Sequence, residues 1–164
     1  MPRRLTTSAP PSHPSSETNP IEILNRDYPY ITQLSYIVYD LLENRLLDSF
    51  NTYIRIPQEV ELTPFICELT DVSREKCDNG IPIEDALDKF YKSCLRSDVI
   101  VAHNAYFDIS MIKIECRRNV DVLKNYVQMM KMFYSGESKK TRCTMLEGMK
   151  HFKLDKFPRL AALY

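Results

Sequence analysis

One short stretch in the second half of the chain carries the side chains best suited to chemistry. It begins with the apolar run Val99-Ile100-Val101, which is typical of a buried strand. Polar His103 and Asn104 follow this run, and Phe107 and Asp108 then open a new helix. In an α/β protein, ligands and catalytic groups gather at the carboxyl ends of strands, where the backbone stops pairing. These four side chains are therefore our candidates for a functional site.

Each of the four residues also has a purely structural interpretation. Asp108 would serve well as a helix N-cap, because an aspartate side chain accepts hydrogen bonds from the free amides of a first turn. His103 would be held at the strand end by a backbone hydrogen bond, Asn104 would form the turn, and Phe107 would pack in the core. Taken singly, these interpretations are favoured. The combined pattern of strand, H-N-x-x-F-D and helix is much harder to obtain by chance.

The composition describes one domain without a strong overall charge. The chain has 164 residues, enough for a single core, and its 22 Lys and Arg balance its 22 Asp and Glu. No overall positive field therefore points to nucleic-acid binding. No apolar run is long enough to cross a bilayer, and no signal peptide follows Arg3 and Arg4. The five cysteines lack C-x-x-C spacing, which predicts reduced thiols in a soluble intracellular protein of the cytoplasm or nucleus.

The chain divides into a tail and one α/β domain. Residues 1–28 are rich in Pro, Ser and Thr, which predicts a disordered tail or long loop. Residues 29–164 form the predicted domain. Within it, residues 31–40 are β-branched and aromatic and apolar on both faces, which predicts a strand in the interior of a sheet. Residues 47–56 alternate between apolar and polar, as expected of a half-exposed antiparallel partner.

Helices make up most of the remaining chain. The strongest begins at Pro82 and has an apolar stripe at helical spacing, which predicts packing against the core. A last short strand is expected to end near Cys143. Further helical segments are predicted at 64–69, 73–78, 108–118, from 121 onward, at 145–152 and from Pro158 onward.

The block V-I-V-A-H-N-x-x-F-D resembles the middle motif of the DnaQ-like (DEDD) 3′–5′ exonucleases, which have an RNase H-like fold. The resemblance runs from about Tyr30 to Tyr164. It includes Leu69-Thr70-Asp71-Val72-Ser73, which is similar to a family stretch written h-T-G-I-S. It also includes Arg142-Cys143-Thr144-Met145, which is similar to the part just before the last family motif. The resemblance implies a mixed sheet with flanking helices.

The same resemblance implies an activity and the residues that carry it. Family members hydrolyse phosphodiester bonds at the 3′ end of single-stranded DNA or RNA, using two Mg²⁺ or Mn²⁺ ions held by four carboxylates. Asp108 would be the catalytic residue and a metal ligand. His103 and Asn104 would lie near the terminal nucleotide, and Phe107 would pack beneath or against it. A polymerase or another replication protein is an implied partner, and a membrane is not.

The departures from the family pattern are as informative as the agreements. Of the four carboxylates only Asp108 has a counterpart, because no Asp-x-Glu precedes Ile31 and no final motif follows Tyr164. One carboxylate does not hold two hard cations. We therefore expect an incomplete copy, without the first central strand and truncated at the C-terminus, that is inactive by itself. The alternative is a non-catalytic scaffold that binds nucleic acid or a polymerase. An unrelated flavodoxin-like enzyme is excluded, because the three glycines form no phosphate loop.

Overall fold

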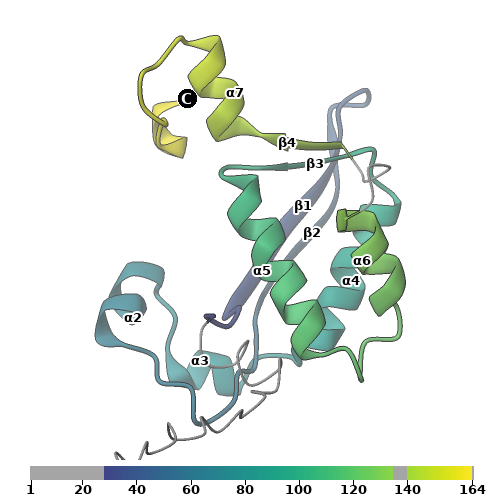
Figure 1. Cartoon of the computed structure of the whole chain (residues 1–164), viewed down its shortest axis with the longest axis vertical. Helices are drawn as coiled ribbons and strands as arrows, with labels where there is room; N and C mark the ends of the chain where they lie inside the picture. Colours follow the sequence, from purple (N-terminus) through teal and green to yellow (C-terminus); the bar gives the residue numbers. More distant parts are fainter. Residues whose placement is uncertain (1–27, 135–139, 164) are drawn as a thin grey trace, which may run out of the picture.

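The computed structural model describes residues 28–134 and 140–163, which form a mixed α/β fold (Figure 1). The structure therefore confirms the α/β fold class predicted from the sequence. The elements in chain order are β1 (Gln33–Asp40), β2 (Arg45–Tyr53), α2 (Pro64–Thr70), α3 (Arg74–Asp78), α4 (Ile83–Leu95), β3 (Val99–Ala102), α5 (Ala105–Arg118), α6 (Tyr126–Tyr134), β4 (Lys140–Cys143), α7 (Thr144–His151) and the 3₁₀ helix η1 (Leu160–Ala162).

The first two strands form an antiparallel hairpin, as the alternation in the second strand predicts. Their register runs from Gln33 opposite Tyr53 to Asp40 opposite Arg45. The turn is held locally, because the Asp40 carboxylate accepts hydrogen bonds from the amides of two turn residues. Asn44 takes a left-handed conformation with φ of 50°, which asparagine tolerates better than most residues.

A side excursion of the chain lies between β2 and α4 and contains α2 and α3. Its two ends meet where Ile54 and Ile81 form an isolated parallel bridge. Gly80 is required beside this bridge, because a Cβ there would lie 2.6 Å from the Tyr53 carbonyl oxygen. The excursion has its own small core, made of Ile56, Val72 and Cys77.

The larger core lies among the helices α4, α5 and α6. In Figure 1, α5 crosses in front of the β1–β2 hairpin, with α4 and α6 to one side of it. The apolar stripe of α4 packs into this core, as predicted, although Leu95 at its end is exposed. The buried members of the core are Leu87, Ile112, Cys116, Leu123 and Met129.

The strands belong to two separate two-stranded sheets. β3 pairs with β4 in parallel, and β1 pairs with β2. The sequence predicts β1 as an interior strand, yet within the described ranges it has a neighbour on one side only. The apolar composition of β1 indicates that its two faces prefer burial. It does not indicate how many strands pair with its edges.

The last part of the chain differs most from prediction. The helix predicted from Pro158 is only the single 3₁₀ turn η1. Apart from Tyr28, the predicted tail of residues 1–28 lies outside the described residues. Within the ranges that are described, none of the helices combines the length and the apolar character that a membrane-spanning helix requires.

Candidate active site

β3 leads into α5 through the pair His103-Asn104. Asn104 is left-handed, with φ of 65° and ψ of 46°, and its carbonyl accepts a hydrogen bond from the Phe107 amide at 2.8 Å. This tight reversal lets α5 begin at Ala105, earlier than the sequence predicts. Asp108 therefore lies within the first helical turn and does not cap it, so the interpretation of Asp108 as an N-cap is wrong.

The ring of His103 links three parts of the chain. Its Nδ1 lies 3.0 Å from the Thr144 hydroxyl, and its Nε2 lies 3.0 Å from the Pro158 carbonyl oxygen. A carbonyl only accepts hydrogen bonds, so Nε2 carries the hydrogen, and in the neutral ring Nδ1 accepts from Thr144. Both ring nitrogens therefore have protein partners. The predicted contact of His103 with substrate stays a prediction.

Asp108 is exposed and lies on the wall of a large cavity. Partial desolvation by this wall raises the pKa of its carboxyl, and the opposing effect of its own backbone amide is smaller. None of the charged residues in the described part of the chain contributes to this shift. A carboxylate in these surroundings gains from an added cation, because the cation restores the interactions that water no longer provides.

Two exposed aromatic side chains flank the site on α5. Phe107 is 56% exposed and lines the same cavity as Asp108, and Tyr106 is 85% exposed. The interpretation of Phe107 as a core residue is therefore wrong. Asn104 is also exposed. The structure brings Phe107 and Asp108 together on one wall, where a ligand can reach both.

The cavity itself has a volume of about 1330 Å³. Its walls come from residues 28–38 with β1, from residues 99–103 with β3, and from the first half of α5. Residues 59–63 close part of one side. Most of the lining is apolar, and Asp108 is one of its few carboxylates.

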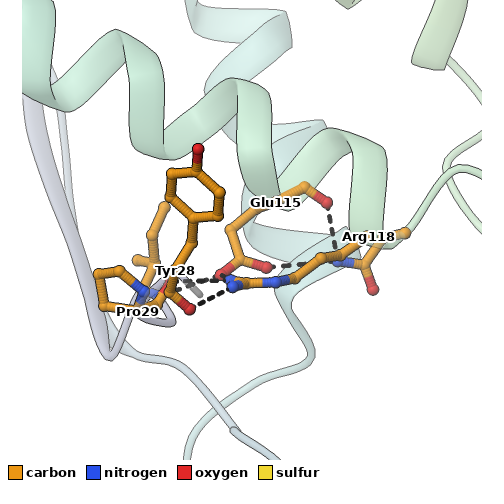
Figure 2. Close-up of polar contacts among 6 residues, drawn as sticks. Tyr28, Pro29, Glu115 and Arg118 are labelled. Carbon is orange, nitrogen blue, oxygen red and sulfur yellow. Dashed lines mark hydrogen bonds and ion pairs between the residues drawn. The ribbon is translucent and has the colours of Figure 1, made fainter. Parts of the chain in front are cut away.

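A second carboxylate of α5, Glu115, has very different surroundings. It is only 2% exposed and accepts a hydrogen bond from the Ile31 amide at 3.1 Å. It also forms an ion pair with Arg118, with Nη1 of the arginine 2.7 Å from Oε1 (Figure 2). Burial raises the pKa of Glu115, although the Ile31 amide and the Arg118 charge both act in the opposite direction.

Arg118 extends this contact to the chain that enters β1. Its Nη1 donates to the Pro29 carbonyl at 2.8 Å, and its Nη2 donates to the Tyr28 carbonyl (Figure 2). Its guanidinium also lies 4.0 Å from the centre of the Tyr30 ring. The C-terminal end of α5 therefore fixes the start of one cavity wall.

A thiol lies close to the same turn. Cys143 ends β4 and precedes α7, in the N-cap position of that helix. Desolvation alone would raise the pKa of the Cys143 thiol, but hydrogen bonds from backbone amides outweigh it and lower that pKa. These amides belong to Asn104, Ala105, Met145 and Leu146.

Comparison with known proteins identifies the family of this chain. A family model described as Exonuclease matches residues 17–159, which is most of the chain. The chain belongs to the exonuclease family. The match confirms the resemblance to the DnaQ-like exonucleases, and the mixed α/β architecture agrees with their RNase H-like fold. In this exonuclease-family chain, the motif H-N-x-x-F-D therefore occupies its expected place between a strand and a helix.

Similar curated proteins are DNA polymerases III of the PolC type. The polymerase of Caldanaerobacter subterraneus subsp. tengcongensis is 34% identical over 74 residues, which are 45% of this chain and 5% of that polymerase. The polymerase of Clostridium perfringens is 32% identical over 87 residues, 53% of this chain and 6% of the polymerase. The chain thus spans only a small part of the length of the relatives it matches.

Exonucleases of this type generally use divalent metal ions, which are held by several oxygen ligands. Over residues 28–134 and 140–163, no group of three or more His, Cys, Asp or Glu side chains is placed to hold a metal ion. Asp108 offers one carboxylate, whereas hard divalent cations take several oxygen ligands. The described residues by themselves therefore do not fit a two-metal site.

Sequence reasoning missed several residues around the site. Thr144 and Pro158 bond to His103 across 41 and 55 residues of chain, which no local spacing reveals. Tyr106 is not among the predicted site residues, although its place inside the H-N-x-x-F-D motif is a usable signal. Cys143 has a signal as well, because it stands two residues before the helix predicted at 145–152, and the amides of a first helical turn are free.

Proposed function

We propose that this chain is the core of a 3′–5′ exonuclease, which hydrolyses terminal phosphodiester bonds of single-stranded DNA or RNA. The observation that carries the proposal is the position of Asp108. Its carboxylate lies in the first turn of α5, directly after the carboxyl end of β3, on the wall of the cavity. Family membership supports nuclease chemistry, and this position supplies a carboxylate for it.

We propose substrate contacts for the side chains that are exposed to solvent beside Asp108. Phe107 and Tyr106 are aromatic and exposed beside Asp108, and stacking of a base on an aromatic ring is worth about 1–3 kcal/mol. Asn104 offers an exposed amide to the terminal nucleotide. His103 would reach substrate only through its ring carbons, because both nitrogens bond within the protein. We therefore assign base contact mainly to Phe107.

We further propose that Asp108 is one ligand of Mg²⁺ or Mn²⁺, and that other carboxylates come from outside the described residues. Oxygen atoms are the ligands these cations take. The described part of the chain contains no cluster of such ligands. We also propose that this chain alone does not hydrolyse nucleic acid, because Asp108 is the one family carboxylate with a counterpart in its sequence.

A digestion assay tests these proposals. Single-stranded oligonucleotides labelled at the 3′ or the 5′ end are incubated with Mg²⁺ or Mn²⁺ and either this chain or a form extended by its flanking coding sequence. We expect release of mononucleotides from the 3′ end only by the extended form. In that form, Asp108→Asn should lower the rate at least about 100-fold, because a lost cation ligand weakens transition-state stabilisation.

Three outcomes would contradict this account. Hydrolysis by the chain alone would overturn the expectation that carboxylates are lacking. Full activity of Asp108→Asn in the extended form would remove Asp108 from the site. An inactive extended form would overturn the exonuclease proposal and favour the scaffold.

The scaffold is the second candidate, and one observation favours it specifically. The described residues hold no metal-binding cluster, which is the arrangement expected if the fold is retained without the chemistry. Such a protein would bind single-stranded nucleic acid or a polymerase without cutting, and the PolC-type relatives suggest a replication context. We also propose an intracellular location, because the five cysteines are thiols and not members of disulfides. Fluorescence anisotropy with a labelled oligonucleotide would detect binding without hydrolysis.

A further inference from the structure

The chain after α7 carries a concentration of positive charge. Residues 150–159, which we call the basic segment, contain one carboxylate, Asp155, and four exposed cations: Lys150, Lys153, Lys156 and Arg159. Among the ion pairs that the described residues form, none involves these four cations. Their charge is therefore not used within the described part of the protein, and a ligand can reach it.

The basic segment is anchored beside the candidate active site by His103. The two nitrogens of this ring contact the Thr144 hydroxyl, at the start of α7, and the Pro158 carbonyl, near the end of the segment, each at 3.0 Å. The chain also returns across α7, because a Cβ at Gly148 would lie 2.8 Å from the Leu163 side chain. In Figure 1, α7 and the chain after it stand above β3 and the beginning of α5. The basic segment therefore lies at the end of α5 that carries the candidate site.

One of these cations occupies a strained backbone position. Lys153 follows the end of α7 in a left-handed conformation, with φ of 52°. The Leu154 amide donates to the Met149 carbonyl at 2.9 Å, which is the hydrogen bond of a Schellman helix end. Glycine is the usual residue at this place, because it has no Cβ to cause strain. A lysine there costs stability, which indicates that its side chain has a role outside folding.

Two aromatic rings are exposed within the basic segment. Phe152 is 56% exposed and precedes Lys153, and Phe157 is 58% exposed and follows Lys156. Neither ring belongs to the hydrophobic cores of the described residues. Proteins that bind single-stranded nucleic acid combine cations for the backbone with aromatic side chains on which bases stack. The basic segment contains both kinds of side chain.

The cavity beside Asp108 lacks positive side chains. Its acidic lining residues are Glu59, Glu61 and Asp108, and none of the described lining residues is Lys or Arg. Nucleic-acid binding depends on neutralisation of phosphates by cationic side chains. Phosphates beyond the terminal nucleotide therefore require cations outside the cavity. The basic segment supplies such cations at the same end of α5.

We propose that the basic segment binds the phosphodiester backbone of a single strand upstream of its 3′ end. Lys153, Lys156 and Arg159 contact phosphates, and the rings of Phe152 and Phe157 stack on bases. The inference rests on the exonuclease proposal, and it leaves the terminal nucleotide in the cavity. The added contact determines how tightly the strand is held, and it does not act on the bond that is hydrolysed.

A binding assay without divalent metal tests the phosphate contacts. Fluorescence anisotropy measures the affinity of the whole chain for a labelled oligothymidylate of about twelve nucleotides. Lys153→Gln combined with Lys156→Gln should weaken binding at least about tenfold at about 50 mM salt, and should lower the salt slope by about 1.4, because each phosphate contact to a single strand contributes about 0.7. The matched control, Arg55→Gln combined with Lys89→Gln, removes two exposed cations elsewhere and should leave binding unchanged.

A glycine variant separates binding from folding. Lys153→Gly relieves the left-handed strain, so it should raise the melting temperature by about 2–4 °C. The same variant should weaken strand binding at least about threefold, because a phosphate contact is lost. Higher stability together with unchanged binding would remove Lys153 from the contact and overturn the explanation of its backbone strain.

An abasic strand tests the stacking contacts. Phe157→Leu keeps an apolar side chain at this position but removes the ring. It should weaken binding of oligothymidylate at least about fivefold, and should leave binding of an abasic strand of equal length unchanged. An equal loss for both strands would mean that the ring does not stack on a base.

Kinetics of the extended form separate this inference from the exonuclease proposal. There, Lys153→Gln combined with Lys156→Gln should raise KM at least about tenfold at unchanged kcat, whereas Asp108→Asn should lower kcat and keep the affinity. Hydrolysis with unchanged KM in the double variant would overturn this inference alone. Strand binding by the basic segment without hydrolysis by the extended form would overturn the exonuclease proposal alone.

Three binding results would also overturn the inference. An equal loss in the control pair would mean that overall charge, and no defined segment, attracts the strand. Tighter binding of a duplex of equal length would assign the basic segment to double-stranded nucleic acid. Displacement of the strand by polyglutamate at equal charge would assign it to an acidic protein surface.

Discussion

Helix α5 carries an acidic side chain near each end, and the two have opposite surroundings. Glu115 is buried, and both of its carboxylate oxygens have protein partners, with Ile31 and Arg118 on one oxygen and Asn119 on the other. Asp108 is exposed and faces the cavity, and no charged residue among those the structure describes shifts its pKa. A carboxylate whose oxygens are all used within the protein stabilises the fold. A carboxylate that faces a cavity is available to a ligand.

The largest expected effect comes from removing the buried carboxylate. Glu115→Ala removes the counter-charge of the buried Arg118 guanidinium and the acceptor of the Ile31 amide, so we expect the free energy of unfolding to fall by about 3–5 kcal/mol. Asp108→Ala should change it by less than about 0.5 kcal/mol. Urea denaturation measures both. Equal effects of the two substitutions would contradict the different roles assigned to Glu115 and Asp108. Glu115→Gln, which keeps one oxygen acceptor, serves as an intermediate control.

The thiols near the two ends of α5 sharpen the same contrast. Burial raises the pKa of Cys116 to about 12, whereas backbone amides lower the pKa of Cys143 although desolvation opposes them. Iodoacetamide at pH 8 should therefore alkylate Cys143 at least about 100-fold faster than Cys116, because the thiolate is the reactive form. Peptide mass spectrometry of samples quenched over time gives both rates. A faster Cys116 would show that the C-terminal end opens readily.

The turn before α5 offers a smaller test. Asn104 is left-handed, a conformation that costs most residues about 1–2 kcal/mol. Asn104→Ala should therefore destabilise the fold by roughly 1 kcal/mol, whereas Asn104→Gly should be nearly neutral. Thermal unfolding of the two variants side by side measures the difference. If alanine were tolerated as well as glycine, the turn would not require this conformation.

The smallest expected effect is the pH dependence that Asp108 contributes. Its folded-state pKa is raised above 3.8, so the folded protein binds this proton more tightly than the unfolded chain does. The resulting stability is complete below about pH 3.8 and is lost as the pH rises through the folded-state pKa. Wild type should therefore lose stability relative to Asp108→Asn over that interval. Carboxyl NMR titration gives the pKa directly, and a value below 3.8 would contradict the prediction.

Local sequence signals predict the helices and strands well, but they predict poorly which distant segments contact one another. The β1–β2 hairpin, α4 and the β3–α5 junction follow from alternation, helical spacing and turn residues, which act within a few positions. Asp108 became a candidate in the same way. The exposure of Phe107 and the pairing of β1 within the described ranges depend on distant segments, and a local pattern does not encode them. The partners of His103 were missed for the same reason.

The bridge between Ile54 and Ile81 has a consequence for how this fold tolerates change. The chain leaves the domain and returns to it at adjacent points, and the residues between them carry a separate small core. A shorter or longer module at this place must keep Gly80 at the junction and an apolar surface against Tyr30 and Tyr53, which pack on the small core. Variation in length among redesigned versions of the domain is therefore best introduced there.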